Sequence, residues 1–181
     1  MSEDNKGVTY SFDVCSQCNS VCCRDARPPL SKRRKKILKK YLNSRKIDSK
    51  EPFVKEKYSY PAFDEDFLCT LFDKKTGKCS VHAVKPETCR AGPVTFDINF
   101  RTKKVEWFLK KEGICAYAGV LFRDNDALSA HLEVAKKELT RLICELDADD
   151  LRAIVKIDEP ATFKIGDDDL PLEVAKKMGL T

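Results

Sequence analysis

The chain of 181 residues contains no long hydrophobic run and little glycine. A helix that crosses a bilayer requires about 18 consecutive apolar residues, and no segment of this sequence approaches that length, so we expect no membrane span. Only seven glycines are present, which argues against a low-complexity chain. The polar start, residues 1–6, does not resemble a secretory signal, and we therefore expect a cytoplasmic protein.

Motifs of several large enzyme classes are also missing. The sequence contains neither the nucleotide-binding patterns GxGxxG and GxxxxGK nor the hydrolase patterns GxSxG and HExxH. It therefore gives no support for a dinucleotide-binding or S-adenosylmethionine-binding domain, and it identifies no catalytic residue.

Positive charge is concentrated in one segment. Residues 32–46 contain nine Lys or Arg residues and no acid, whereas the whole chain carries a net charge of only +5. Ser31 is a suitable N-cap for a helix that runs to about Ser44, with Ile37, Leu38, Tyr41 and Leu42 on one face. The basic residues of this helix form a solvated face or a surface for an acidic protein or a nucleic acid.

Nine cysteines are the most informative feature of the composition. In a reducing cytoplasm, closely spaced cysteines hold metals or perform redox chemistry more often than they form disulfides. An odd number also cannot pair completely within one chain. A disulfide-stapled protein remains the alternative, and it would show few free thiols when denatured without reductant.

Eight of the cysteines form two groups of candidate metal ligands. The first group lies within nine residues, and the second runs from a predicted hairpin at residues 67–81 to Cys115, beyond a second hairpin; in chain order the eight are Cys15, Cys18, Cys22, Cys23, Cys69, Cys79, Cys89 and Cys115. Thiolates are the usual ligands of structural zinc and of iron–sulfur clusters. Eight thiolates suffice for two four-thiolate sites, or for one site with spare cysteines.

A hairpin is predicted to bring two of these sulfurs together. Residues 67–72 are typical of a strand, residues 73–77 of a turn, and residues 78–81 of a return strand. A turn centred near Lys75 places Leu71 opposite Cys79. Cys69 then lies diagonally across from Cys79 on the same face.

Several of these segments together resemble a known family. The N-terminal cysteine cluster is followed by Leu68-Cys69, by Gly77-Lys78-Cys79-Ser80-Val81-His82 and by Lys85-Pro86-Glu87-Thr88-Cys89-Arg90. This combination is similar to the YkgJ-type cysteine-cluster family, whose CxxCxxCC motif is associated with zinc or iron chelation, and flagellin lysine N-methylase carries a related cysteine pattern. The resemblance covers roughly residues 15–115. It implies metal binding, with redox or protein-methylation-related chemistry as a further implication.

This sequence departs from the family pattern at three places. Val21 lengthens the first motif to CxxCxxxCC, His82 stands where tyrosine is common, and Lys85 stands where arginine is common.

Four further residues have candidate roles. His82 is either a metal ligand or an exposed side chain. Arg90 either donates hydrogen bonds to cluster sulfurs or to an anionic ligand, or forms a surface salt bridge. His131 lies on an apolar helical stripe and is predicted to be a core or boundary residue, and Cys144 is predicted to be unligated.

The remaining pattern predicts an α+β fold, a small cysteine-rich domain organised by metal, with antiparallel hairpins and packed helices. Apolar residues alternate through 94–100 and 105–109, which predicts a second hairpin. A long helix is predicted over 124–146, with its apolar stripe on that hairpin, and short helices near 149–156 and 172–178. We expect a cysteine-cluster domain over residues 1–123 and a helical segment over 124–181 packed on it.

Two functional hypotheses follow. The first is a cysteine-ligated protein that holds an iron–sulfur cluster and acts on or with a protein partner. The second is a structural zinc module that presents the basic helix to a nucleic acid or an acidic protein.

Overall fold

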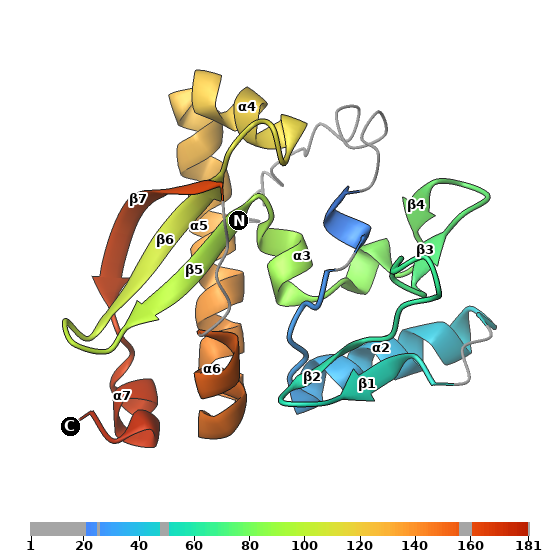
Figure 1. Cartoon of the computed structure of the whole chain (residues 1–181), viewed down its shortest axis with the longest axis horizontal. Coiled ribbons are helices and arrows are strands. Elements are labelled where there is room, and N and C mark those ends of the chain that lie inside the picture. The colour runs from blue at the N-terminus through green and yellow to red at the C-terminus, as the bar shows by residue number, and fades with distance from the viewer. Residues whose placement is uncertain (1–20, 25, 48–50, 156–160, 181) are drawn as a thin grey trace, which may run out of the picture.

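The computed structural model describes residues 21–24, 26–47, 51–155 and 161–180 and has the predicted α+β class (Figure 1). Among these residues, no helix combines the length and apolar character that a membrane crossing requires. The described elements, in chain order, are η1 Val21–Cys23, α2 Lys32–Ser44, β1 Phe53–Lys55, β2 Ser59–Pro61, β3 Phe72–Asp73, β4 Lys78–Cys79, η2 His82–Val84, α3 Glu87–Ala91, β5 Val94–Asn99, β6 Lys104–Lys110, α4 Ala116–Arg123, α5 Asn125–Glu145, α6 Ala148–Ile154, β7 Thr162–Asp169 and α7 Leu172–Met178.

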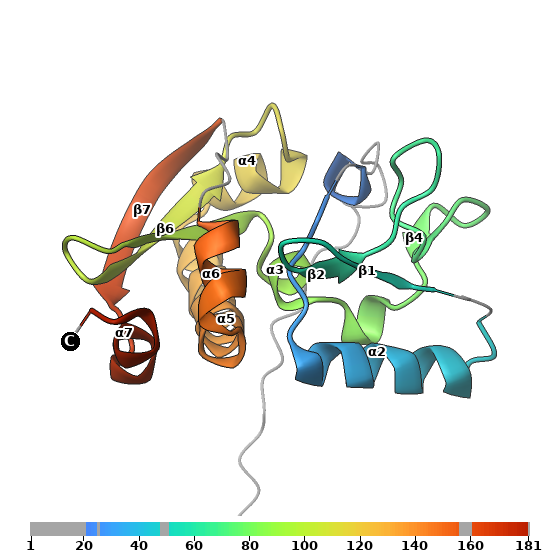
Figure 2. The same cartoon turned by 60° about the horizontal axis from the view of Figure 1, so that its bottom comes forward.

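Two hydrophobic cores organise these elements. The smaller core lies beneath α2 and consists of Leu30, Leu38, Leu42, Leu71 and Val81. The larger core lies between the sheet β5-β6-β7 and the helices α5, α6 and α7. Figures 1 and 2 show the short helix α3 between these two parts of the molecule.

The basic helix α2 begins where the sequence predicts. The Ser31 hydroxyl accepts a hydrogen bond from the Arg34 backbone N–H at 3.1 Å, which satisfies one of the free donors at the start of the helix. Leu38 and Leu42 are buried in the smaller core. The predicted helix and its N-cap are therefore confirmed.

The first hairpin differs from the prediction by one residue in register. Phe72, and not Leu71, lies opposite Cys79, and the paired strands are only two residues long. The loop has four residues because the Gly77 N–H donates to the Asp73 carbonyl at 2.9 Å, and Gly77 adopts the left-handed φ of 67° that favours glycine. Phe67, predicted to be in the strand, also has a positive φ, so the extended conformation does not reach it.

The second hairpin is confirmed, and the structure adds a third strand. Val94 pairs with Leu109 and Ile98 with Val105, so the apolar residues share one buried face. Strand β7 pairs with β6. The sequence did not indicate β7, because this strand ends in three aspartates instead of continuing an apolar alternation.

The long helix α5 packs on this sheet as expected. Asp124 caps it by accepting the Ala127 N–H at 3.0 Å. Its buried side chains contact the sheet residues predicted as the core face, and they include Ala135, Leu139, Leu142 and Ile143. The short helices near 149 and 172 are confirmed as α6 and α7, whereas α4 had not been predicted.

The Asp168 carboxylate of strand β7 is expected to make the stability of the protein depend on pH. The Asp168 carboxylate accepts the Trp107 indole N–H at 2.6 Å and pairs with Lys136 at 2.9 Å. The hydrogen bond from Lys136, and then that from Trp107, holds the pKa of this carboxyl below its ordinary value. A lowered pKa contributes stability above the unfolded-state value, and this contribution is lost as the pH falls through the folded-state value.

We therefore expect Asp168→Asn to lower the free energy of unfolding at pH 7 by about 0.5–1 kcal/mol, a modest cost because the side chain is half exposed. Urea unfolding at a series of pH values should show this cost shrinking below about pH 4. Asp169→Asn is the matched control, because that side chain is 91% exposed and should matter little. A cost for Asp168→Asn that stayed constant down to pH 2 would contradict the assignment.

Candidate metal centre

Five of the predicted ligands lie in one region of the structure. Cys22 and Cys23 belong to η1, Cys79 to β4 and Cys89 to α3, and Cys69 lies in the loop before β3. The Cys69 backbone N–H donates to the Cys23 carbonyl at 2.8 Å, which joins two of these segments directly. Cys69 and Cys79 both pack against the smaller core. Burial raises the pKa of the Cys69, Cys79 and Cys89 thiols, and the charges of neighbouring cysteines add to this rise.

The loop before Cys69 is ordered by one carboxylate. The Asp64 side chain accepts the backbone N–H groups of Asp66 and Leu68, each at 3.0 Å, and pairs with Lys74 at 2.8 Å. The hydrogen bond from Lys74 is the largest influence that lowers the Asp64 pKa, so this carboxyl remains an acceptor at neutral pH. Such Asx turns set the direction of the following backbone, and here that backbone carries Cys69.

Backbone N–H groups oppose the effect of burial on two of the thiols. Burial is the largest cause of the raised pKa of Cys69 and of Cys79, and the backbone N–H of Leu71 and that of Val81, each two residues further along the chain, act in the opposite direction. Each N–H group favours the thiolate, because a hydrogen bond to the charged form stabilises that form. Hydrogen bonds to sulfur also tune metal–thiolate centres, so both turns are suited to hold a thiolate ligand.

Burial opposes ionisation of the same thiols. It is the largest cause that raises the pKa of Cys69 to about 11 and that of Cys89 to about 12. Cys22 differs: a hydrogen bond from Cys23 lowers its pKa to about 6, against the effect of burial, and the pKa of Cys23 is raised in return. The ligand form of cysteine is the thiolate, so a cation bound here would have to displace protons from Cys69 and Cys89.

Lys85 places a positive charge near several thiols. Burial raises the pKa of Cys79 and Cys89, and the charge of Lys85 opposes that rise. The hydrogen bond with Cys23 lowers the pKa of Cys22, and Lys85 adds to the lowering. The pKa of His82 is lowered by burial and then by the charges of Lys85 and Arg90, although its side chain is largely exposed. Thiolates formed here when a metal binds would therefore be stabilised by the positive charge of Lys85.

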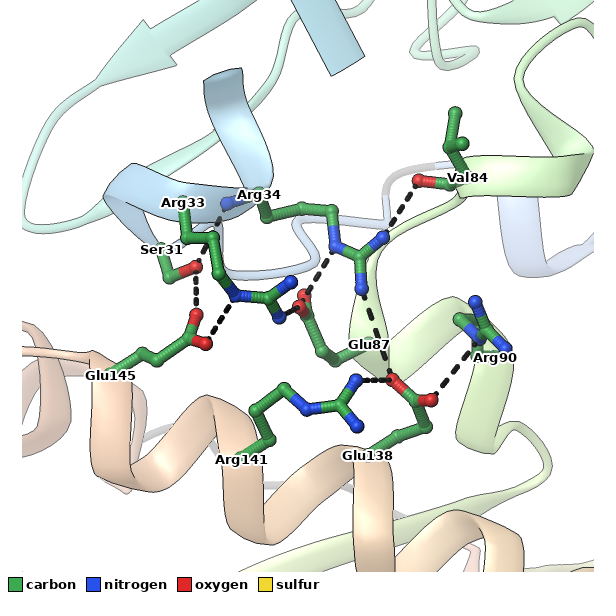
Figure 3. Close-up of polar contacts among 9 residues, drawn as sticks. All are labelled: Ser31, Arg33, Arg34, Val84, Glu87, Arg90, Glu138, Arg141 and Glu145. Atoms are coloured by element: carbon green, nitrogen blue, oxygen red, sulfur yellow. Dashed lines mark hydrogen bonds and ion pairs between the residues drawn. The ribbon is translucent and has the colours of Figure 1, made fainter. Parts of the chain in front are cut away.

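The charged residues packed against α3 were not identified from the sequence (Figure 3). Glu87 is fully buried, and its carboxylate accepts hydrogen bonds from Arg34 Nε at 2.8 Å and from Arg33 Nη2 at 3.1 Å. A signal was present, because Arg34 precedes Leu38 and Leu42 at helical spacing and so lies on the buried stripe of α2. Glu138 shares the buried stripe of α5 in the same way.

Arg90, a candidate ligand-binding residue, lies in this charged group. Its Nε atom is 3.5 Å from Glu138 Oε1, and its side chain is 39% exposed. The structure thus contains the ion pair foreseen as one alternative, and a role toward sulfur or an anion remains a prediction.

The donor set is suited to a thiophilic metal. Four segments contribute thiols, and thiolates are ligands for both zinc and iron. Within the described ranges 21–24, 26–47, 51–155 and 161–180, no three cysteine, histidine or acidic side chains are close enough to hold a metal ion as they stand. The predicted ligands Cys15 and Cys18 lie outside those ranges.

The remaining candidates lie elsewhere. Cys115 is the N-cap residue of α4 and packs against the larger core. Cys144 packs against the same core, and burial followed by a hydrogen bond with Glu173 raises its pKa to about 12. His131 is buried and its Nε2 atom is 2.9 Å from the Ala91 carbonyl oxygen, which confirms it as a core residue.

Comparison with known proteins identifies the family of this chain. Residues 14–116 match the CxxCxxCC family, which carries the description "Putative zinc- or iron-chelating domain". The match spans more than half of the chain, and the protein belongs to this family. No curated protein and no solved structure matches the chain. The protein is thus a metal-binding protein of the cysteine-cluster type, and the identity of its metal is a separate question.

Proposed function

We propose that this protein holds an iron–sulfur cluster in the thiol-rich region around Cys69, Cys79 and Cys89. The observation that carries the proposal is that η1, the Cys69 loop, β4 and α3 each bring a cysteine into one region, in which the Cys69 N–H donates to the Cys23 carbonyl at 2.8 Å and both Cys69 and Cys79 pack against the smaller core. Cys15, Cys18, Cys22, Cys23 and Cys115 complete the candidate ligand set. An iron–sulfur cluster supplies one-electron redox chemistry when bound.

The types of donor side chain favour an iron–sulfur cluster over zinc. Cysteine dominates the donors, whereas structural zinc sites often include histidine. The chain has only two histidines, and His131 is buried against the Ala91 carbonyl.

The related cysteine pattern of flagellin lysine N-methylase adds redox or protein-methylation-related chemistry, with a protein substrate, to the proposal. A cytoplasmic location belongs to the same proposal, because a reducing compartment keeps the thiols free to bind.

Anaerobic purification followed by metal and sulfide analysis tests the proposal. The expected result is a brown protein with stoichiometric iron and acid-labile sulfide and with broad absorption near about 400 nm. A colourless protein with stoichiometric zinc would reject the cluster and support the second function.

The second candidate function is a zinc module that presents α2 to a polyanion. Four lysines lie at helical spacing on the exposed side of α2, namely Lys32, Lys36, Lys39 and Lys40. Among the residues that the structure describes, none of them forms an ion pair with an acid, whereas Arg33 and Arg34 of the same helix do. The exposed charge of α2 is thus smaller than the sequence suggests, but it occupies one face.

If this face binds nucleic acid, Lys36→Glu with Lys40→Glu should weaken binding of the zinc-loaded protein to a duplex oligonucleotide by about tenfold or more. Lysines that contact phosphate release counterions, so the wild-type affinity should also fall steeply with salt, with a logarithmic slope of about −3.6 for four contacts on a duplex. Lys75→Glu, an exposed change elsewhere on the surface, is the control. Equal binding by both variants and the wild type, measured by fluorescence anisotropy, would rule out this face.

A further inference from the structure

Helix α3 carries Cys89 but is too short to hold its own position. It has only five residues, Glu87–Ala91. Isolated helices shorter than about 12 residues are marginal in water, so the place of α3 depends on contacts with other elements. Those contacts determine where the Cys89 sulfur lies relative to Cys69 and Cys79.

The first turn of α3 is held by α2. Glu87 is fully buried and accepts two arginine hydrogen bonds, the shorter from Arg34 Nε at 2.8 Å. Arg34, itself buried, also donates to the Val84 carbonyl at 3.2 Å, immediately before α3. A buried carboxylate is tolerated only when it is paired in this way, so α2 holds the start of α3.

The last turn of α3 is held by α5. His131 Nε2 lies 2.9 Å from the Ala91 carbonyl oxygen, and Glu138 Oε1 lies 3.5 Å from Arg90 Nε. Cys89 therefore lies between the buried ion pair of Glu87 with α2 and the contacts that Arg90 and Ala91 make with α5.

Glu138 is the residue that joins these contacts (Figure 3). Its Oε2 atom is 3.1 Å from Arg141 and 3.8 Å from Arg34, and its Oε1 atom is 3.5 Å from Arg90. The side chain is 7% exposed. One carboxylate of α5 thus contacts arginines of α2 and α3 at once, and its removal would loosen α3 without touching any thiol.

We propose that Glu138 is a positioning residue for the metal centre, acting through α3 on the Cys89 thiolate. This inference rests on the proposed function, in that Cys89 must be a ligand. Groups that orient a metal ligand from outside the coordination sphere typically change metal affinity by about 10–100-fold, because small displacements of one ligand weaken the whole site.

The test uses the full chain, stripped of metal, reduced and kept anaerobic, with Co²⁺ alone as the probe. Glu138→Gln preserves the shape of the side chain and removes its charge. We expect a dissociation constant for Co²⁺ about tenfold above that of the wild type, with a weaker sulfur-to-cobalt charge-transfer band. Glu133→Gln, an exposed change on the same helix, should leave both unchanged.

A combination with Cys89→Ser separates positioning from general stability. In the Cys89→Ser background, Glu138→Gln should weaken Co²⁺ binding no further, because the ligand on which it acts is gone. An equal loss in both backgrounds, or a wild-type affinity and band in Glu138→Gln, overturns the proposal. If Glu138→Gln does not fold, Glu138→Asp supplies the same comparison, and wild-type affinity in that variant also overturns it. Failure of the wild type itself to bind Co²⁺ would instead refute metal binding at Cys89.

Discussion

Replacing Cys79 and Cys89 together by serine is expected to abolish metal retention and to lower the melting temperature by about 8–16 °C. The smaller core has only five fully buried apolar residues, and Cys69 and Cys79 pack at its edge. Ligation should therefore supply much of the stability of this part of the chain. A metal present at about 1,000 times its dissociation constant contributes about 4 kcal/mol, and each kcal/mol corresponds to about 2–4 °C for a chain of this size.

Metal content and thermal unfolding should be measured together. A chelator should lower the melting temperature of the wild type by a similar amount and should have little further effect on the double variant. Cys144→Ser is the matched control, because Cys144 lies in α5 against the other core, and its metal content should match that of the wild type. An unchanged melting temperature in the double variant would leave these cysteines without a structural role.

Trp107→Ala should destabilise the protein by about 3–5 kcal/mol through the larger core. The Trp107 side chain is 1% exposed, lies opposite Phe96 in the hairpin, and donates its indole N–H to Asp168 at 2.6 Å. The substitution leaves a cavity and removes a donor to that carboxylate, and both effects act in the same direction. Urea unfolding of the metal-loaded protein should show the loss.

Trp107→Phe divides this effect into its two parts. Phenylalanine retains much of the buried volume but lacks the N–H donor, so its cost should be about 1–2 kcal/mol. Neither variant should change the metal stoichiometry at low denaturant, since Trp107 belongs to the larger core, whereas Cys69 and Cys79 pack against the smaller one. A cost below about 1 kcal/mol for Trp107→Ala would contradict the tight packing on which the prediction rests.

Periodicity and local chemistry explain which parts of the fold were predictable. The hairpin of β5 and β6 and the helix α5 were found because their apolar residues repeat at spacings of two and of three to four residues. The start of α2 was found because Ser31 bonds a backbone group only three residues away. Strand β7 was missed because its pairing with β6 joins segments more than 50 residues apart, and its aspartates give no strand signal.

The candidate site also combines local features, which the sequence shows, with contacts between distant segments, which it does not show. The cysteine positions and the family to which they belong are readable from the sequence, since ligand type and spacing are local properties. The register of the first hairpin was one residue wrong, because a hydrogen bond of Gly77 determined the length of the turn. The sequence does not show which thiols lie near one another, because Cys22, Cys69 and Cys89 come from segments separated by tens of residues.

The sequence by itself determined that this protein is a cysteine-rich α+β protein of a metal-chelating family, with a basic helix that begins at Ser31. Only the tertiary structure decided that Arg34 of that helix is buried and not solvated, and that it pairs with Glu87 beside Cys89 and with Glu138 of α5. The physical reason is the cost of burying charge. An arginine on a buried helix stripe is stable only where opposite charges converge on it, and those carboxylates come from distant parts of the chain.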